Sequence, residues 1–435
     1  MKLFMLLLVP ILSVQAAPQI DNTLPADSDT VSSECTPQET VEASDDNALQ
    51  VQVKGFLDTY HAVRTEGRAD WMASRTRVRG ELKLEKGAAS LFLSLNATYN
   101  GILKERTGLE LREAYLSYAK GNFDLRVGRQ IVVWGVADAL RVTDCVSPFD
   151  YTEFLAQDYD DIRMPVNGLR AKYTRGSVTL EAVCNPVADF FVLPTDERNP
   201  WAIRLPSAPQ PYTTDLESGK PEKKIKNMEF GGRASVNLSG IDFSVSALRT
   251  WNKQPALCPA LSGDGRTLHI NGQYRRMTML GADCSLPVGQ FVLRAEVAEY
   301  IGEAQGSGLG QNAVRRNTLN ALAGVDWYPG NDWNISVQYC HKYTSGNLAA
   351  LSIYRNAGLA TARLSKELLH NTLKLSTFAY IDVASGGIFN RLSVSYSLND
   401  DIELTVGYDY FYANKGKFAM YGKNSEAWVK MKYSF

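Results

Sequence analysis

The stretch AWVKMKYSF, residues 427–435, alternates apolar and polar side chains from its first residue to its last. Its apolar positions are Ala427, Val429, Met431, Tyr433 and Phe435. Successive side chains of a β-strand point to opposite sides, so this alternation predicts a strand with two unlike faces. One face then needs an apolar environment, and the other, which carries two lysines, needs water or polar partners.

The same alternation recurs from residue 49 onward. IELTVGYDY (402–410) and RLSVSYSL (391–398) show it without a break. We count about 18 such segments, which predicts an all-β chain. The segments begin near residues 49, 73, 88, 109, 122, 167, 177, 228, 241, 268, 290, 317, 333, 356, 372, 388, 402 and 425.

The connections between these segments fall into two classes. One class is tight (KGA, AKGN, RGS, SGID, PVGQ, YPGND, LLHN and NDD), and the other is long, above all at 135–166 and 186–226. Tight turns on one side and long loops on the other are typical of a transmembrane β-barrel. We therefore predict an antiparallel transmembrane β-barrel of about 18 strands (16–18) over residues 49–435.

A large soluble β-sandwich or β-propeller is the alternative fold. A propeller would show a repeat of about 40–50 residues, and the sequence has no such repeat. Trp327 and Trp333 flank the turn YPGND on the apolar faces, as expected of an aromatic girdle at a membrane interface. Both observations favour the barrel.

Two segments precede the barrel. Residues 1–17 combine one lysine, an apolar run and small residues, which is typical of a secretory signal peptide. Residues 18–48 contain acids but no lysine or arginine, which predicts a flexible periplasmic segment. The formal net charge of −1 gives no case for a nucleic-acid partner. The six cysteines fit no zinc spacing, and both disulfides and free thiols remain open for them.

If the apolar faces meet lipid, the polar faces line the lumen. Arg75, Arg77 and Arg79 then form an inward ladder, because an arginine at mid-depth on the lipid face would cost about 2–4 kcal/mol. Glu113 and Arg126 are expected on the same wall. Either the ladder selects an anionic solute or its arginines pair with lumen acids and stiffen the wall. In a third interpretation, residues 20–48 fold back against the ladder as a plug.

The hairpin REAYLSYAKGNFDLRVGRQ (112–130) raises a question of register. If all four residues of AKGN form the turn, Arg112 lies opposite Arg129 on the lipid face, which is an unfavourable pair. A bulge at Gly128 would turn Arg129 into the lumen, toward Glu113. We therefore expect Arg129 in the lumen wall and protein contacts around the apolar run IVVW that follows.

Two long loops are candidates for control of the lumen. Loop 135–166 is expected to fold into the barrel and narrow it, its acids facing the ladder, with an extracellular excursion as the alternative. The acids proposed for this constriction are Asp150, Glu153, Asp158, Asp160 and Asp161. Loop 186–226 is rich in proline and apolar residues. It predicts a rigid lid or a patch for a hydrophobic ligand, or else a compact surface loop.

Several motifs resemble a family of bacterial outer-membrane barrels of unassigned function. They are LREAYLSY, LRVGRQIVVWG followed by AD and LRVTD, SPFDYTEF and DIRMP, within residues 109–215. Members are often encoded beside RND-type exporters, so the resemblance implies movement of hydrophobic or lipid-like solutes and an RND-type exporter as a partner. The hairpin is also similar to porins. The stretch 427–435 resembles the last strand of outer-membrane barrels, which implies recognition by the barrel assembly machinery.

We therefore expect a channel or transporter in the lipid bilayer of the bacterial outer membrane, without a cofactor, passing small or hydrophobic solutes. The alternatives are an outer-membrane scaffold or adhesin and a hydrolase at the rim. A hydrolase would need a base beside a nucleophile. His61, His269 and His341 lie near the long loops, but no GxSxG motif or metal-spaced cluster accompanies them. We do not expect an enzyme.

Overall fold

The computed structural model describes residues 48–154, 159–203, 211–349, 351, 353–416 and 418–435. The expected signal peptide (1–17) and the acidic segment, up to residue 47, lie outside the described residues, as do Cys35 and Asp158. The predicted plug of residues 20–48 therefore stays a prediction.

Eighteen strands form one closed antiparallel sheet, so the predicted fold and strand number are confirmed. The strands are β1 (Gln50–Arg64), β2 (Trp71–Lys86), β3 (Ala89–Asn100), β4 (Gly108–Lys120), β5 (Phe123–Gln130), β6 (Val166–Arg175), β7 (Val178–Asn185), β9 (Glu229–Leu238), β10 (Ile241–Trp251), β13 (Arg276–Val288), β14 (Phe291–Gln305), β15 (Val314–Trp327), β16 (Trp333–Thr344), β17 (Asn356–Leu368), β18 (Leu373–Asp382), β19 (Gly387–Ser397), β20 (Ile402–Tyr412) and β21 (Glu426–Ser434).

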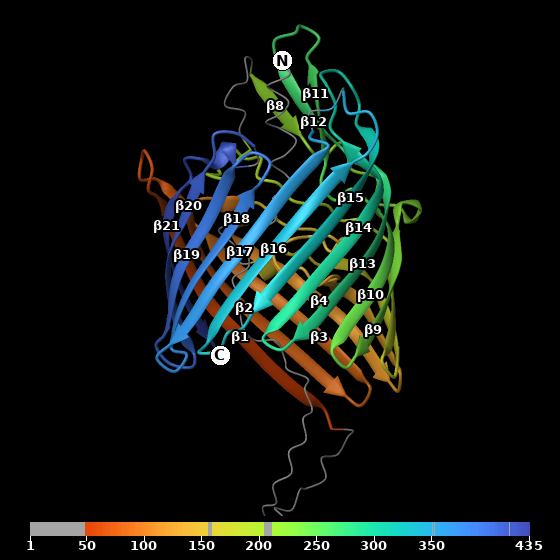
Figure 1. The fold of residues 1–435 in the computed structure, drawn as a ribbon, viewed down its shortest axis with the longest axis vertical. Coiled ribbons are helices and arrows are strands. Elements are labelled where there is room, and N and C mark those ends of the chain that lie inside the picture. The colour runs from red at the N-terminus through yellow and green to blue at the C-terminus, as the bar shows by residue number, and fades with distance from the viewer. Residues whose placement is uncertain (1–47, 155–158, 204–210, 350, 352, 417) are drawn as a thin grey trace, which may run out of the picture.

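The stretch 427–435 closes the barrel. Strand β21 pairs with β1, with Tyr433 opposite Leu57, and Gly55 exchanges two backbone hydrogen bonds with Phe435. The apolar side chains of β21 are exposed on the outer face, whereas Trp428 points inward and is buried. The apolar face predicted from the alternation is therefore the outer surface of the barrel, and the polar face lines the lumen. Each strand tilts across the wall, and the C-terminal residue lies at the end with the tight turns (Figure 1).

A small second sheet caps the end of the barrel that carries the long loops (Figure 1). It comprises β8 (Tyr212–Asp215), β11 (Ala256–Leu261) and β12 (Leu268–Gln273), and β12 pairs with β8 in parallel. The predicted start of a wall strand at residue 268 is therefore wrong. Residues 268–273 belong to the cap, and the wall strand β13 begins at Arg276.

The described helices are short. They are α2 (Tyr159–Ile162) and the 3₁₀ turns η2 (Lys104–Arg106), η3 (Ile225–Asn227) and η4 (Ala419–Tyr421). Within the described part of the chain, no helix is long and apolar enough to cross a membrane.

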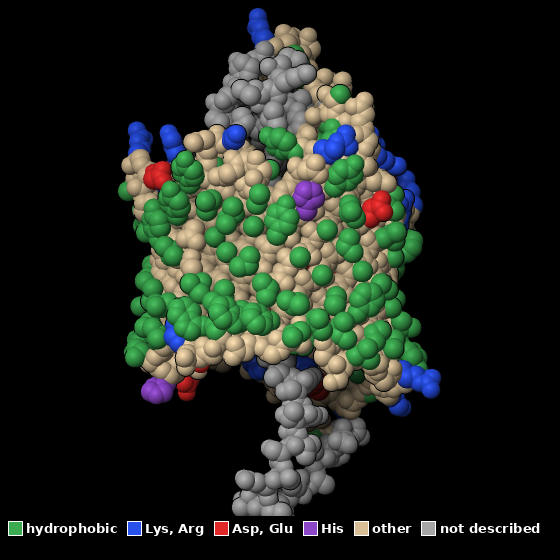
Figure 2. All heavy atoms as spheres, viewed as in Figure 1, with side chains coloured by type: hydrophobic (Ala, Val, Ile, Leu, Met, Phe, Trp, Pro, Cys, Tyr) green, Lys and Arg blue, Asp and Glu red, His purple; other side chains and the backbone are tan. Residues whose placement is uncertain are grey.

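The outer wall of the barrel is apolar. Hydrophobic side chains cover it, with a dense row near the tight-turn rim, while charged side chains gather beyond the two rims (Figure 2). Trp327 and Trp333 are both exposed on this surface, and Trp327 stacks on Phe291 with ring centroids 5.9 Å apart. This distribution suits a lipid bilayer with an aromatic girdle at its interface.

The lumen changes character along the barrel axis. Toward the long loops it is filled by fully buried side chains, among them Trp134, Phe149, Trp201, Tyr380 and Phe389. Toward the tight turns, inward charged side chains stay partly exposed. The side chains of Lys83 and Arg126, for example, are 42% and 36% exposed, against 7% for Arg77 nearer the loops. The lumen is therefore packed at the loop end and accessible to water at the turn end.

The register of the hairpin between β4 and β5 differs from the expected one. Lys120 lies opposite Phe123, so Gly121 and Asn122 alone form the turn, and Gly121 has a positive φ of 60°. Two-residue turns of this kind suit the twist of antiparallel strands. As a result Arg129 lies opposite Ala114, and the predicted pair of like charges does not arise.

The bulge is also in a different strand. The register of β3 with β4 shifts around Arg112, with Ser94 opposite Glu113 and Leu95 opposite Leu111. The extra residue lets Arg112, which is 9% exposed, face the lumen together with Glu113. The expected bulge at Gly128 is therefore wrong, and β5 keeps its regular alternation.

Arg129 consequently stays on the outer face, on the same side as the exposed Val127. Its Nε donates a hydrogen bond to the carbonyl oxygen of Leu111 at 2.9 Å. The predicted place of Arg129 in the lumen wall is wrong. Gly128 is required for another reason: its φ is 136°, and a Cβ there would lie 2.3 Å from the carbonyl oxygen of Ala114.

Candidate functional site

The candidate site is the lumen and the chain that crosses it. Residues 131–165, of which 131–154 and 159–165 are described, connect β5 to β6, and we call them the lumen segment. At the near wall, Glu113 Oε1 accepts a hydrogen bond from the Ile131 amide at 2.8 Å. The indole Nε1 of Trp134 donates to Glu181 of β7 at 2.8 Å. Protein therefore buries Val132 and Trp134 of the apolar run IVVW, whereas Val133 is exposed, so the expected protein contacts form around part of the run.

At the opposite wall, Glu296 of β14 holds the lumen segment. Its carboxylate accepts hydrogen bonds from the backbone amides of Val136 and Ala137 and, at 3.1 Å, from the amide and the hydroxyl of Thr143. Gly135 makes this approach feasible, because a Cβ there would lie 2.6 Å from Glu296 and 2.5 Å from Thr143. The φ of Gly135, 89°, also favours glycine.

The tip of the lumen segment reaches the strands beyond β14. Arg363 of β17 forms an ion pair with Asp138 at 2.5 Å, and Tyr380 of β18 donates its hydroxyl to the Ala139 carbonyl at 2.7 Å. The lumen segment thus touches the wall from β4 to β18. It crosses the lumen rather than narrowing it from one side.

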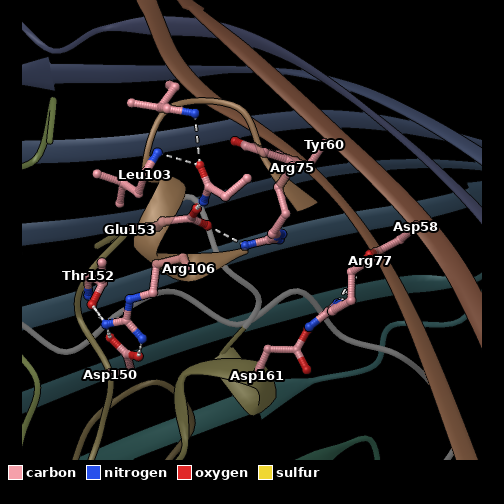
Figure 3. Close-up of polar contacts among 12 residues, drawn as sticks. Asp58, Tyr60, Arg75, Arg77, Leu103, Arg106, Asp150, Thr152, Glu153 and Asp161 are labelled. Carbon is pink, nitrogen blue, oxygen red and sulfur yellow. Dashed lines mark hydrogen bonds and ion pairs between the residues drawn. The ribbon is translucent and has the colours of Figure 1, made fainter. Parts of the chain in front are cut away.

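The return half of the segment lies against the arginine ladder (Figure 3). Asp161 accepts from Arg77 and from Arg79, both at 2.7 Å, and Arg77 is also paired with Asp58 at 2.6 Å. Glu153 forms an ion pair with Arg75. All three ladder arginines face inward and are less than 9% exposed. The charges of the ladder arginines are therefore paired with carboxylates of the protein itself.

Asp161 is the central acid of this contact. Arg112, placed in the lumen by the β4 bulge, donates to the Asp161 carbonyl at 3.3 Å and lies 3.9 Å from its carboxylate. Burial disfavours the charge, but the guanidiniums of Arg77, Arg79 and Arg112 hold the pKa of Asp161 well below its usual range. The carboxylate therefore stays ionised and attached to the ladder.

The other predicted site residues are placed as follows. Asp150 pairs with Arg106 of η2 at 2.9 Å, away from the ladder (Figure 3). Arg126 faces the water-accessible half of the lumen, where its guanidinium lies over Tyr115 and 3.8 Å from Asp124. Asp158 and the side chain of Asp160 lie outside what the structure describes.

The second long loop packs on the lumen segment. Val192 exchanges backbone hydrogen bonds with Phe149 and Tyr151, and Phe191 stacks on Phe149 with centroids 5.9 Å apart. Trp201 is fully buried and contacts Phe154, with centroids 5.6 Å apart. Phe191, Val192 and Trp201 of this loop are therefore packed against protein, whereas Ile225 near its end is exposed.

Sequence reasoning missed the wall residues that hold the segment. The sequence singled out none of Glu296, Asp138 and Arg363. The signal in the sequence is weak, because an inward glutamate and a glycine at 135 are both common in barrels. Only the folded structure shows that the two residues meet. The five described cysteines form no disulfide, and no cluster of metal-ligating side chains occurs in the described ranges.

One histidine does lie beside a serine. His61 Nδ1 is 3.2 Å from Ser74 Oγ, and its Nε2 is 2.9 Å from Thr59 Oγ1. His61 is on the outer face of β1, since the buried Tyr60 and Ala62 on either side point inward. Both ring nitrogens therefore contact hydroxyls, whereas a catalytic triad orients its histidine through an acid or amide.

Comparison with known proteins places the chain in a family. Residues 22–375 match the family DUF1302, described as a protein of unknown function. The chain belongs to this family. A search of curated proteins gave no match. The family resemblance predicted from the motifs at 109–215 is confirmed in this respect.

Solved structures share the fold of this DUF1302 protein. OccK8 (OprE) of Pseudomonas aeruginosa has 8% identity and a TM-score of 0.53, over 88% of this chain and 98% of that one. A BenF-like porin from Pseudomonas fluorescens Pf-5 has 8% identity and a TM-score of 0.51, with the same coverage. OccK2 (OpdF) of P. aeruginosa, in complex with glucuronate, has 10% identity and a TM-score of 0.50, over 88% and 97%. The fold is that of outer-membrane β-barrels, which confirms the predicted location.

Proposed function

We propose that this DUF1302 protein is a solute channel of the outer membrane in which the lumen segment controls passage. The observation that carries the proposal is the two-sided attachment of this segment. Asp161 holds it to the ladder on β2, and Glu296 receives its backbone amides on β14. A segment fixed to both walls closes the lumen, and movement at either wall opens it.

The exposure of the lumen side chains at the turn end supports a gate rather than a solid plug. Inward charges at the turn end are partly exposed, so solvent reaches this end of the lumen, which we call the vestibule. The porin-like fold agrees with a conducting role, and OccK2 is a neighbour whose structure contains glucuronate. The ladder arginines serve here as anchors. Recognition by the barrel assembly machinery and a link to an RND-type exporter remain predictions of the family resemblance.

Conductance tests this function. The full chain is inserted into planar bilayers and compared with Glu296→Gln. This substitution replaces the carboxylate that accepts hydrogen bonds from the segment's amides with a neutral amide, which is a weaker acceptor. The control is Glu367→Gln, because Glu367 is likewise a glutamate of a wall strand but pairs with Lys374, at 3.3 Å, rather than with the segment. We expect brief, small openings in the wild type, a larger open fraction in Glu296→Gln, and no change in Glu367→Gln.

Absence of current in the wild type and in Glu296→Gln would refute the channel and favour a sealed scaffold or adhesin. Among the described residues, the hydrolase alternative would rest on the contact between His61 and Ser74. Hydrolysis of a long-chain nitrophenyl ester in mixed micelles, lost in Ser74→Ala, would support that alternative; we expect none.

A further inference from the structure

A cavity of about 150 Å³ lies between the lumen segment and the wall strands β13 to β17. We infer that it binds a small monocarboxylate with an apolar body about the size of one aromatic ring. This inference rests on the proposed channel function, because it names a solute class and a binding site for it.

The missing acceptor is at Asn320. Its side chain is 6% exposed and lines the cavity, and its Nδ2 has no hydrogen-bond partner. A buried donor without an acceptor costs about 1–3 kcal/mol, so such a group is expected to meet an acceptor in its working state. A ligand oxygen in the cavity supplies that acceptor.

A lysine stands beside this amide. Asn320 of β15 and Lys342 of β16 lie directly opposite each other, and both line the cavity. The Lys342 ammonium is 3.0 Å from both carboxylate oxygens of Glu303. An ammonium has three N–H donors, so a donor remains for a ligand. The amide and the ammonium together match the two oxygens of a carboxylate.

The charge of the lining favours an anion. Three cations, Arg141, Lys253 and Lys342, line the cavity together with one carboxylate, Glu303. A second carboxylate, Glu229, does not line the cavity but pairs with Lys253 at 2.6 Å, so the excess of positive charge is one. Glu303 is already engaged, since it also accepts from the Thr318 hydroxyl at 2.6 Å. A monoanion therefore meets a net positive lining, whereas a cation would be repelled.

Much of the remaining lining is apolar, although Asn252 and Gln254 also contribute, and the volume limits the size of the ligand. Leu140 of the lumen segment, Phe191, Met277 and Leu359 contribute to the lining. An apolar cavity of about 150 Å³ accommodates benzene. A ligand bound here would touch Leu140, so occupation of the cavity bears directly on the position of the lumen segment.

The test uses the full chain in detergent micelles and calorimetric titration with benzoate. Benzamide is the neutral analogue of the same shape, and acetate lacks the ring. Wild type should bind benzoate more tightly than either. Lys342→Met and Asn320→Asp should each weaken benzoate binding about tenfold or more, since a hydrogen bond to a charged group is lost or a repulsive charge is added. Lys342→Met should leave benzamide binding unchanged.

Lys374→Met is the control, because Lys374 also pairs with a wall glutamate but lies outside the cavity. Resistance of the folded barrel to unfolding in SDS shows that each variant is intact. Equal binding of benzoate and benzamide, or an equal loss in Lys374→Met, would overturn the inference. Current without benzoate binding refutes the cavity site and leaves the channel standing. Benzoate binding without current supports the cavity site and refutes the channel.

Discussion

Asp161→Asn should release the return half of the lumen segment from the arginine ladder. The carboxylate is buried and bonded to Arg77 and Arg79 at 2.7 Å each. Removing one partner of a buried ion pair costs about 3–5 kcal/mol. The lower end applies here, because the amide oxygen still accepts one hydrogen bond and Arg77 keeps its contact with Asp58. About 3 kcal/mol lowers the ratio of closed to open channels by about 10²-fold.

Single-channel recording in planar bilayers measures this ratio as the fraction of time spent open. Glu367→Gln again provides the control. The pH dependence adds a second readout, because the pKa of Asp161 is held well below its usual range by the arginines. A depressed pKa stabilises the attached state above the ordinary pKa of about 4, and this stabilisation is lost only as pH falls through the depressed value.

The contribution of this contact to the open fraction of the wild type should therefore stay constant from about pH 8 to about pH 5. The wild type should open only on strong acidification, and Asp161→Asn should lose that response. An open fraction in Asp161→Asn within twofold of the wild type would refute the reasoning. So would a wild type that opens between pH 7 and pH 5 in a manner abolished by this substitution.

Gly135→Ala should raise the open fraction as Glu296→Gln does, because the new Cβ would collide with Glu296 and Thr143. Gly176→Ala should leave the open fraction unchanged, because Gly176 also has a positive φ but lies in a turn with no atom near its Cβ position. Arg126→Ala should reduce anion preference in reversal-potential measurements, because this side chain is partly exposed in the vestibule, whereas Arg129→Ala on the outer face should leave it unchanged. Burial raises the pKa of the Cys145 thiol to about 11. Mass spectrometry should therefore find Cys145 unlabelled by maleimide in the wild type and labelled faster in Asp161→Asn.

Alternation was sufficient to predict the barrel, because the faces of each strand meet environments as different as lipid and lumen. It failed at residues 268–276, where β12 carries an alternating pattern of its own but belongs to the cap. Strand β12 pairs with its neighbour β11 and also, in parallel, with β8, a four-residue strand far away in the chain. Neither the length nor the pairing of β8 leaves a periodic signal.

The charged residues of the lumen were harder to assign. Arg75, Arg77 and Arg79 follow from parity, but parity at Arg112 and Arg129 depends on a register that the turn sets. Taking four residues for the turn instead of two moved Arg129 opposite Arg112 and led to a bulge in the wrong strand. The attachment at Glu296 depends on a contact between residues 136 and 296, and alternation carries no information about such a pair.

Gln130 and Val166, the residues that flank the lumen segment, lie opposite each other on β5 and β6, and Gly128 and Gly168 form a rung just below them. The segment therefore starts and ends at one point of the wall. Its ends are joined by the barrel whether it is attached or released, so the entropy of closing this loop is common to both states. In the proposed gate, the wall is a fixed frame and the segment moves about these two ends, so single side chains can change its position without disturbing a strand.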